Sequence, residues 1–350
     1  MSENYNENLN NETFGESTTF TPEVFIPILS PEEIAKMDEK RNLRKNANTI
    51  GLALLLVSAF SVVLSFILSF AEILLIKITG KSGVLTTPAA SEVINVIFSL
   101  AVFGLLFTMV FKFAGFRISD LMSFKKTEKG LALPLFFFGI SFCAFANMAS
   151  SVLDSVFQNF GIDYAVPQRE LPKGVFGFLL FFIATAVVPA LIEEFALRGI
   201  VLGVLRKYGD SFALIATSIC FGIMHSNFEQ IPFAFVVGLF LGFSVIKTGS
   251  LRVAIAVHFY NNLISVIVNY LSEYLPENVI NIGYALLLLL TLTIGIFMLW
   301  KTDKDFFQIE KGESVLTEKE KNKTFFTSGT IIAFCIVNLI EAGLYILIQG

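Results

Sequence analysis

The sequence predicts an all-α fold, a polytopic integral membrane helix bundle with about eight or nine transmembrane helices. Hydrophobic residues make up 55% of the 350 residues and charged residues only 15%, against about 45–50% and about 25% in soluble globular proteins. The apolar residues also gather in runs of roughly 17–30, the length that a helix needs to cross about 30 Å of hydrocarbon. A chain of this composition cannot cover its apolar surface in water.

A polar segment precedes nine candidate spans. Residues 1–46 are rich in Asn, Glu, Ser and Thr, and we predict a disordered acidic tail whose last part, 31–46, can form a short helix at the membrane face. Residues 47–350 form the predicted transmembrane domain. Its candidate spans are about 48–76, 93–116, 130–158, 174–205, 210–226, 231–247, 252–271, 278–300 and 325–348. The fourth is long and contains Pro189, so a kink is expected there.

The distribution of Lys and Arg along the chain predicts the orientation of these spans. If the tail is cytoplasmic, all but four of the 25 Lys and Arg residues fall on the cytoplasmic side. The four exceptions are Lys77, Lys81, Arg169 and Lys173. Positive residues favour the cytoplasmic side of a membrane. We therefore expect a multi-pass protein of the cell membrane with a cytoplasmic N-terminus.

Several classes of protein are not supported. No Lys- and Arg-rich block indicates a nucleic-acid partner. The three cysteines are far apart within apolar runs, and no C-x-x-C pair indicates structural zinc. There is no G-x-S-x-G motif and no H-E-x-x-H helix, so neither the serine-hydrolase elbow nor the zinc-protease helix is present.

Ionisable residues at membrane depth mark the candidate site, because such groups are costly there and tend to face a bundle interior. They fall in three motifs, each in a different apolar run: Glu-Glu-x-x-x-Arg at 193–198, Phe-x-x-x-His at 221–225 and His-x-x-x-Asn at 258–262. The two histidines are the only ones in the chain. Any one of these residues could be a structural staple, but together they indicate a site.

Helical spacing predicts how these residues are used. Glu194 and Arg198 are four residues apart on one helix face and can form an ion pair. Glu193 lies about 100° round the helix and is free to face something else. Phe221 is one turn before His225 and can pack beneath its imidazole. His258 and Asn262 are also four residues apart and can present two side chains to one point.

The chemistry that fits this set is hydrolysis by an activated water molecule. A carboxylate beside a neutral imidazole can hold and deprotonate water. A second imidazole and a carboxamide can donate to the oxyanion that forms when this water attacks a peptide carbonyl. The alternative is that Glu193, His225 and His258 bind a divalent metal such as zinc, which acidifies the water. The first version needs no cofactor.

The three motifs, in this order on successive apolar runs, resemble the CPBP intramembrane endopeptidases, which include the Ras-converting type of CAAX prenyl protease and bacterial proteins of bacteriocin processing and self-immunity. The resemblance covers about 170–275 and implies a catalytic core there. It implies that Glu193 is the general base, that His225 helps to hold the water, and that His258 and Asn262 form the oxyanion site. Glu194 and Arg198 would be supporting residues.

The implied partners are the lipid bilayer and a peptide or protein substrate, either prenylated at a CAAX terminus or of the bacteriocin type. A second class of function stays open at this point. A non-catalytic membrane protein, such as a bacteriocin immunity factor or a small-solute transporter, could use the same polar cavity. A transporter would more readily show two related halves with broken helices, and the sequence shows no such repeat.

Overall fold

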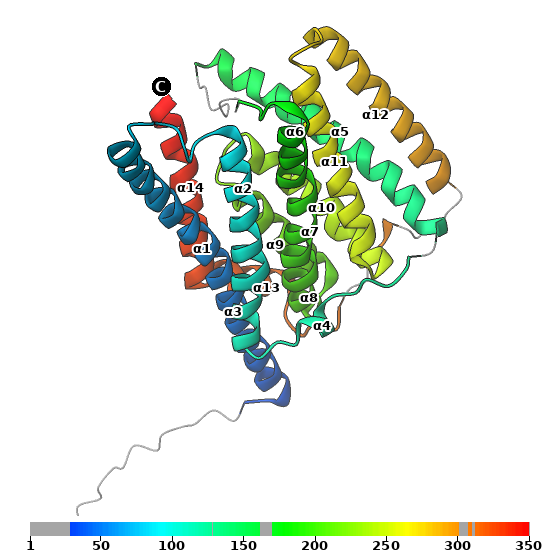
Figure 1. The fold of residues 1–350 in the computed structure, drawn as a ribbon. Coiled ribbons are helices and arrows are strands. Elements are labelled where there is room, and N and C mark those ends of the chain that lie inside the picture. The colour runs from blue at the N-terminus through cyan, green and yellow to red at the C-terminus, as the bar shows by residue number, and fades with distance from the viewer. Residues whose placement is uncertain (1–28, 128, 162–169, 301–306, 310–311, 350) are drawn as a thin grey trace, which may run out of the picture.

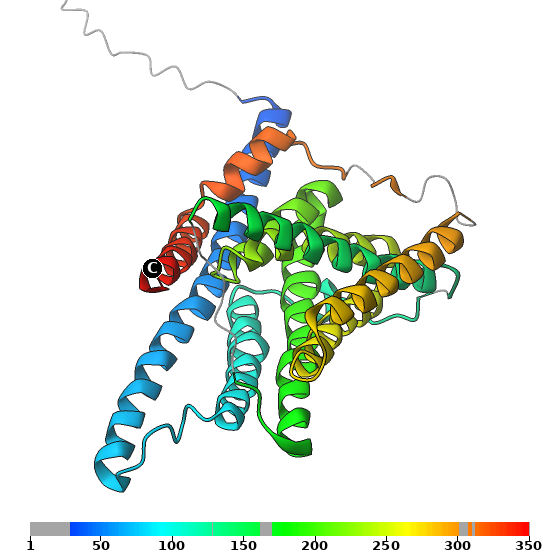
Figure 2. The same ribbon diagram turned by 90° about the horizontal axis from the view of Figure 1, so that it is seen from above.

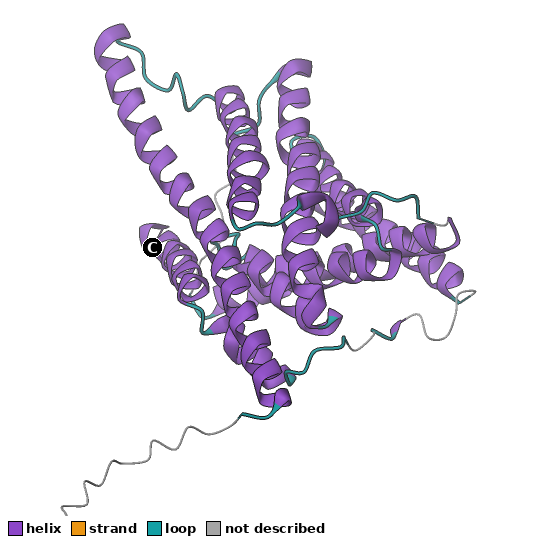
Figure 3. Ribbon diagram, turned by 90° about the horizontal axis from the view of Figure 1, so that it is seen from below, coloured by secondary structure: helices purple, strands orange, loops and turns teal. Residues whose placement is uncertain are grey.

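The computed structural model describes residues 29–127, 129–161, 170–300, 307–309 and 312–349. Within these ranges every regular element is a helix and none is a strand (Figure 3), which confirms the all-α prediction. The elements are α1 (Pro31–Thr79), α2 (Pro88–Ser99), η1 (Leu100–Leu106), α3 (Phe107–Phe113), α4 (Ile118–Leu121), α5 (Lys129–Asn159), α6 (Gly174–Phe182), η2 (Ile183–Val187), α7 (Val188–Glu193), η3 (Glu194–Val201), α8 (Leu202–Leu205), η4 (Arg206–Tyr208), α9 (Asp210–Ile223), α10 (Gln230–Thr248), α11 (Leu251–Leu271), α12 (Glu277–Leu299), α13 (Glu318–Phe326) and α14 (Gly329–Gln349).

Seven helices in the described residues are long and apolar enough to cross a membrane, and the count becomes eight if the bent pair α13 and α14 is one span. The multi-pass membrane bundle is thereby confirmed. The predicted span at 210–226 is instead the 14-residue helix α9, which rises only about 21 Å. The last predicted span is bent by 66° between α13 and α14. Thr327 and Ser328, at this bend, make hydrogen bonds to residues of α1.

The first helix corrects the boundary predicted at residue 46. α1 begins at Pro31 because Ser30 and Glu33 form a capping box and a proline fits the first helical position. It then runs without a break for 49 residues to Gly80, whose φ of 70° ends it in the left-handed conformation. The part at 31–46 is therefore the base of the first span, not a separate helix. Residues 1–28 of the predicted tail lie outside the described residues.

The span that carries the two glutamates is one continuous rod from Gly174 to Tyr208 with two π-helical segments, η2 and η3. Extra-wide helical turns are rare and occur frequently at functional sites. Pro189 lies at the start of α7, directly after η2. Proline has no N–H for the carbonyl four residues earlier, so the local departure from α-helical geometry follows from the sequence.

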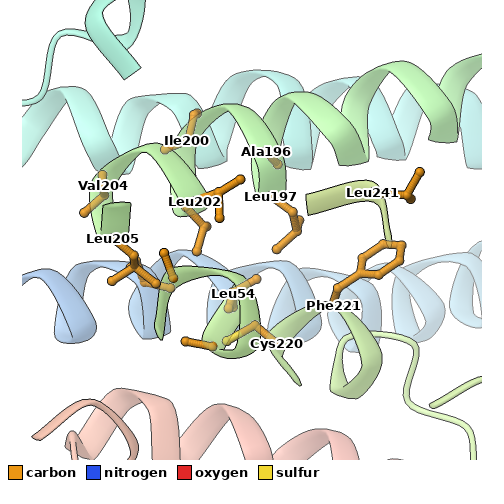
Figure 4. Packing of buried hydrophobic residues seen from close by; sticks show 14 of the residues in the cluster. Leu54, Ala196, Leu197, Ile200, Leu202, Val204, Leu205, Cys220, Phe221 and Leu241 are labelled. Atoms are coloured by element: carbon orange, nitrogen blue, oxygen red, sulfur yellow. The ribbon is translucent and has the colours of Figure 1, made fainter. Parts of the chain in front are cut away.

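The rod runs through the middle of the bundle, with α5 and α12 packed together on one side and α1 with α14 on the other (Figures 1 and 2). α9 and α10 pack against each other beside it. The main hydrophobic core surrounds the C-terminal half of the rod, where Leu197, Leu202 and Leu205 are fully buried. Figure 4 shows Leu54 of α1 and Phe221 of α9 in the same cluster. This packing holds the rod near α11, which bears His258, and α9, which ends two residues before His225.

Candidate active site

Glu194 is the centre of a buried ion-pair cluster. Its Oε1 accepts a hydrogen bond from Arg198 Nη1 at 2.8 Å and is 2.9 Å from His258 Nδ1. The side chains of Glu194 and Arg198 are fully buried, and that of His258 is 8% exposed. The pairing of Glu194 with Arg198 that the spacing predicted is confirmed. The bond to His258 joins two spans that lie 64 residues apart in sequence.

Arg198 is held from two further directions. Its Nη2 donates to the carbonyl oxygen of Gly238 on α10 at 3.4 Å, and its guanidinium carbon lies 4.0 Å from the centre of the Phe221 ring. A Cβ atom at position 238 would stand 3.3 Å from Arg198 Nη2 and 3.2 Å from Phe221 Cδ1. A glycine therefore lets α10 approach the guanidinium.

Glu193 lies next to the cluster but is not part of its ion pair. Its Oε2 is 3.9 Å from His258 Nε2, and its side chain is 19% exposed. This oxygen is itself buried and makes no hydrogen bond to any described residue. His258 Nδ1 faces Glu194, a carboxylate that can only accept when ionised, so Nδ1 carries the proton and Nε2 is directed to Glu193. The two glutamates thus have different environments, as the spacing predicted.

His225 reaches the cluster through Phe221. Its Nδ1 lies 2.8 Å from the carbonyl oxygen of Phe221, which can only accept, so His225 also uses Nδ1 as the donor and leaves Nε2 open. The Phe221 ring meets the His225 imidazole edge to face at 4.9 Å between centroids, and the His258 imidazole at 6.0 Å. The predicted packing of Phe221 against His225 is confirmed, and the phenyl ring in addition separates the two histidines.

Asn262 bonds to the backbone next to the π-helical segment. Its Nδ2 donates to Thr185 O at 3.1 Å, the carbonyl that Pro189 leaves without its helical partner. Its Oδ1 accepts a bond of 3.2 Å from Asn261 Nδ2. One N–H of the carboxamide is therefore engaged with the rod, and an amide nitrogen carries a second. The bonds of Asn262 fix α11 against the rod at the level of the site.

Sequence reasoning missed a row of hydrogen-bonded side chains beside this site, formed by three asparagines and one tyrosine. Asn147 of α5 donates to Tyr284 of α12 at 2.9 Å and lies 3.5 Å from Asn261 Oδ1. Asn261 then connects to Asn262. The row extends from α12 through α5 and α11 to the rod. Only the amide residues themselves, isolated in apolar runs, could have indicated it, because the pairing partners lie on different helices.

The metal alternative, with Glu193, His225 and His258 as ligands, stays a prediction. Among the residues that the structure describes, no group of three or more His, Cys, Asp or Glu side chains is arranged to hold a metal ion. Glu193, His225 and His258 therefore do not form a ligand set in this arrangement.

The fold and the site define a class: a multi-pass helical membrane protein with a buried carboxylate–imidazole centre between its spans. Residues 175–264 match the model of a family described as type II CAAX prenyl endopeptidase Rce1-like. This segment, less than a third of the chain, holds all three motifs. Over this segment, the match bears out the resemblance to a protease family that the motifs indicated. No curated protein and no solved structure matches the chain.

Proposed function

We propose that the protein is an intramembrane endopeptidase that uses Glu193 as the general base in the hydrolysis of a peptide bond. The observation that carries the proposal is the pair formed by Glu193 Oε2 and His258 Nε2. Glu193 Oε2 is buried without a hydrogen-bond partner among the described residues, His258 Nε2 is the imidazole nitrogen that Glu194 does not engage, and the two atoms are 3.9 Å apart. Two groups at this separation can both hydrogen-bond one water molecule at about 2.8 Å.

The proposed reaction needs only water and the peptide. Glu193 takes a proton from the water, and the water oxygen forms a bond to the carbonyl carbon. The negative charge that develops on the carbonyl oxygen is stabilised by N–H donors, the role proposed for Asn262 and for His258 in its doubly protonated form, in which Nδ1 donates to Glu194 and Nε2 donates to the oxyanion. The C–N bond then breaks as the proton passes from Glu193 to the leaving nitrogen. The products are a carboxylic acid and an amine, which exchange a proton to give a carboxylate and an ammonium group.

The supporting residues keep these groups in place. Glu194 accepts a hydrogen bond from Nδ1 of His258, so it fixes Nε2 as the nitrogen that faces the site. Arg198 balances the charge of Glu194, which is fully buried. His225, with its Nδ1 bound to the Phe221 carbonyl, presents Nε2 as an acceptor that can help to hold the water. We propose a membrane-associated peptide as the substrate, either prenylated at its C-terminus or of the bacteriocin type.

The test is cleavage of a peptide library that contains prenylated and unmodified C-termini, with products identified by mass spectrometry. The purified protein should cleave a subset, and Glu193→Gln should abolish cleavage because an amide cannot accept the proton. Glu277→Gln is the matched control, since Glu277 is exposed at the start of α12 and should leave cleavage unchanged. Equal cleavage by the wild type and Glu193→Gln would refute the role of Glu193.

Two other outcomes of the same experiment decide the alternatives. If a chelator abolishes wild-type cleavage and zinc restores it, the metal version of the mechanism replaces the proposed one. If no library member is cleaved by any variant, the non-catalytic reading, an immunity factor or a transporter, gains support. Chelator-resistant cleavage that depends on Glu193 supports the mechanism as written.

We also propose that the N-terminus faces the cytoplasm. Segments predicted on that side lie together at the base of α1: Glu39 accepts hydrogen bonds from Ser314 Oγ at 2.5 Å and Val315 N at 3.0 Å, and Arg44 donates to Thr327 O at 2.8 Å. Single cysteines placed at Lys36 and Lys81 of a cysteine-free variant provide the test. An impermeant thiol reagent applied to intact cells should label position 81 and spare position 36. The reverse pattern would invert the topology.

A further inference from the structure

The loop that carries His225 contains an unusual backbone conformation. Ser226 has a φ of 50°, and it is the one non-glycine residue with a positive φ in the described chain. It follows the end of α9, where the N–H groups of His225 and Ser226 bond to the carbonyls of Gly222 and Ile223 in a tightened last turn. This left-handed position after a helix is usually occupied by glycine. A serine there is strained unless other contacts hold it.

The contact that holds Ser226 comes from the C-terminal helix. Ser226 Oγ donates to Asn338 Oδ1 of α14 at 2.5 Å. The Asn338 side chain is fully buried, and its Nδ2 donates to Phe334 O at 2.8 Å, which orients the amide oxygen. The same oxygen accepts a second hydrogen bond, of 3.1 Å, from Ser58 Oγ of α1. A buried amide in an apolar helix is costly unless it is bonded. Here the Asn338 nitrogen donates to the helix backbone, and the oxygen accepts from the two serine hydroxyls.

These two hydroxyls have different consequences. The bond from Ser58 joins α1 to α14, and helix packing accounts for it. The bond from Ser226 does not join two spans. It fixes the backbone directly after His225, whose ring is in turn fixed by the Phe221 carbonyl. Both α1 and α14 lie outside residues 175–264, the segment that matches the protease family.

We propose that Asn338 is a positioning residue for His225: it holds Ser226 in the left-handed conformation and thereby sets the direction in which the imidazole presents Nε2. The role of His225 in hydrolysis rests on the proposed function, but its position in the loop does not. In this arrangement the C-terminal helix completes the site without contacting substrate. A displacement of about 1 Å of a catalytic group can cost a hundredfold in rate.

A readout that does not need activity comes from the histidine content. The chain has two histidines, so full-length protein in detergent, labelled with ¹³Cε1-histidine and purified through a tag without histidine, gives two signals. His258→Gln assigns them. Asn338→Leu, which keeps the size but removes the acceptor, should shift or split the His225 signal by more than its linewidth and leave the His258 signal in place. Ser58→Ala, which removes the other donor to the same oxygen, should leave both signals unchanged.

Ser226→Ala is the second variant, for the case that Asn338→Leu fails to fold. It removes one hydroxyl and leaves α14 unchanged. It should move the His225 signal as Asn338→Leu does. An unchanged His225 signal in Ser226→Ala, or an equal shift in Ser58→Ala, overturns the proposal.

Kinetics separates this result from the proposed function. On a cleaved peptide, Ser226→Ala and Asn338→Leu should lower kcat by roughly tenfold to a hundredfold with little change in KM, whereas Ser58→Ala should retain wild-type values. A purely structural role would lower the thermal stability of the three variants without a selective loss in kcat. If the wild type and Glu193→Gln cleave alike, the proposed function fails, while the histidine signals still decide the role of Asn338.

Discussion

The ion pair between Glu194 and Arg198 allows the sharpest test of how the site is built. Both side chains are fully buried, and their atoms are 2.8 Å apart. Arg198→Met keeps most of the side-chain volume but leaves the Glu194 carboxylate with His258 as its one remaining partner. Breaking a buried pair on one side costs about 3–5 kcal/mol, because the other charge stays desolvated. We expect a loss of this size in the free energy of unfolding.

The double variant Glu194→Leu/Arg198→Met carries the argument further. With both charges gone, no desolvated ion remains, so the double variant should be clearly more stable than the sum of the two single losses predicts. The expected interaction free energy is about 2–3 kcal/mol. Its catalytic activity should not return, because His258 Nδ1 has then lost the acceptor that orients it.

The assay uses the cysteines of the chain. Cys143 and Cys220 are each 1% exposed and Cys335 is half-buried, so a thiol-reactive dye reports their exposure as the protein unfolds in detergent under heat or denaturant. The single Trp300 is 82% exposed and is a poorer probe. If the double variant loses as much stability as the two single variants added together, the two charges do not depend on each other and the reasoning is refuted.

Two further predictions concern close packing and a buried amide, both measured by the same thiol assay. Gly238→Ala should lower the free energy of unfolding by about 1–3 kcal/mol, because the new Cβ would press on the Arg198 guanidinium and the Phe221 ring. Gly283→Ala in α12 is the control. A Cβ there meets nothing within 4 Å, so this variant should be neutral or stabilising. Tyr208→Phe should lower the free energy of unfolding by about 1–3 kcal/mol, because Asn46 Nδ2 donates to the buried Tyr208 hydroxyl at 3.0 Å and would lose that partner. Equal stability of Tyr208→Phe and wild type would contradict the assigned bond.

Local rules explain which site features the sequence could predict. The pairing of Glu194 with Arg198 depends on one helical turn, and so does the contact of Phe221 with His225. The carbonyl of Thr185 lacks its helical donor because Pro189 has no N–H. In each case a short stretch of backbone fixes the geometry, so residue spacing carries the information. The apolar runs likewise predicted the helices, because their length must match the bilayer.

Features that depend on how helices dock were not predictable in this way. The run at 210–226 is long enough to cross a membrane, but α9 ends at Ile223. A tight turn follows, and it begins the loop that carries His225. α1 and its polar base are one helix, and that base makes hydrogen bonds to Ser314, Val315 and Thr327, which are distant in sequence. The π-helical geometry of η3 likewise has no simple sequence signal.

The sequence by itself determined a helical membrane protein, the three polar motifs and the pairing of neighbours one turn apart. Only the tertiary structure decided that Glu194, rather than Glu193, bonds to His258, that Asn262 bonds to Thr185, and that Asn338 of the last helix holds the loop after His225. The physical reason is the range of the interactions. A helix fixes the relation between residues three or four apart, whereas contacts between spans depend on the rotation, tilt and depth of each helix, which the packing of the whole bundle sets.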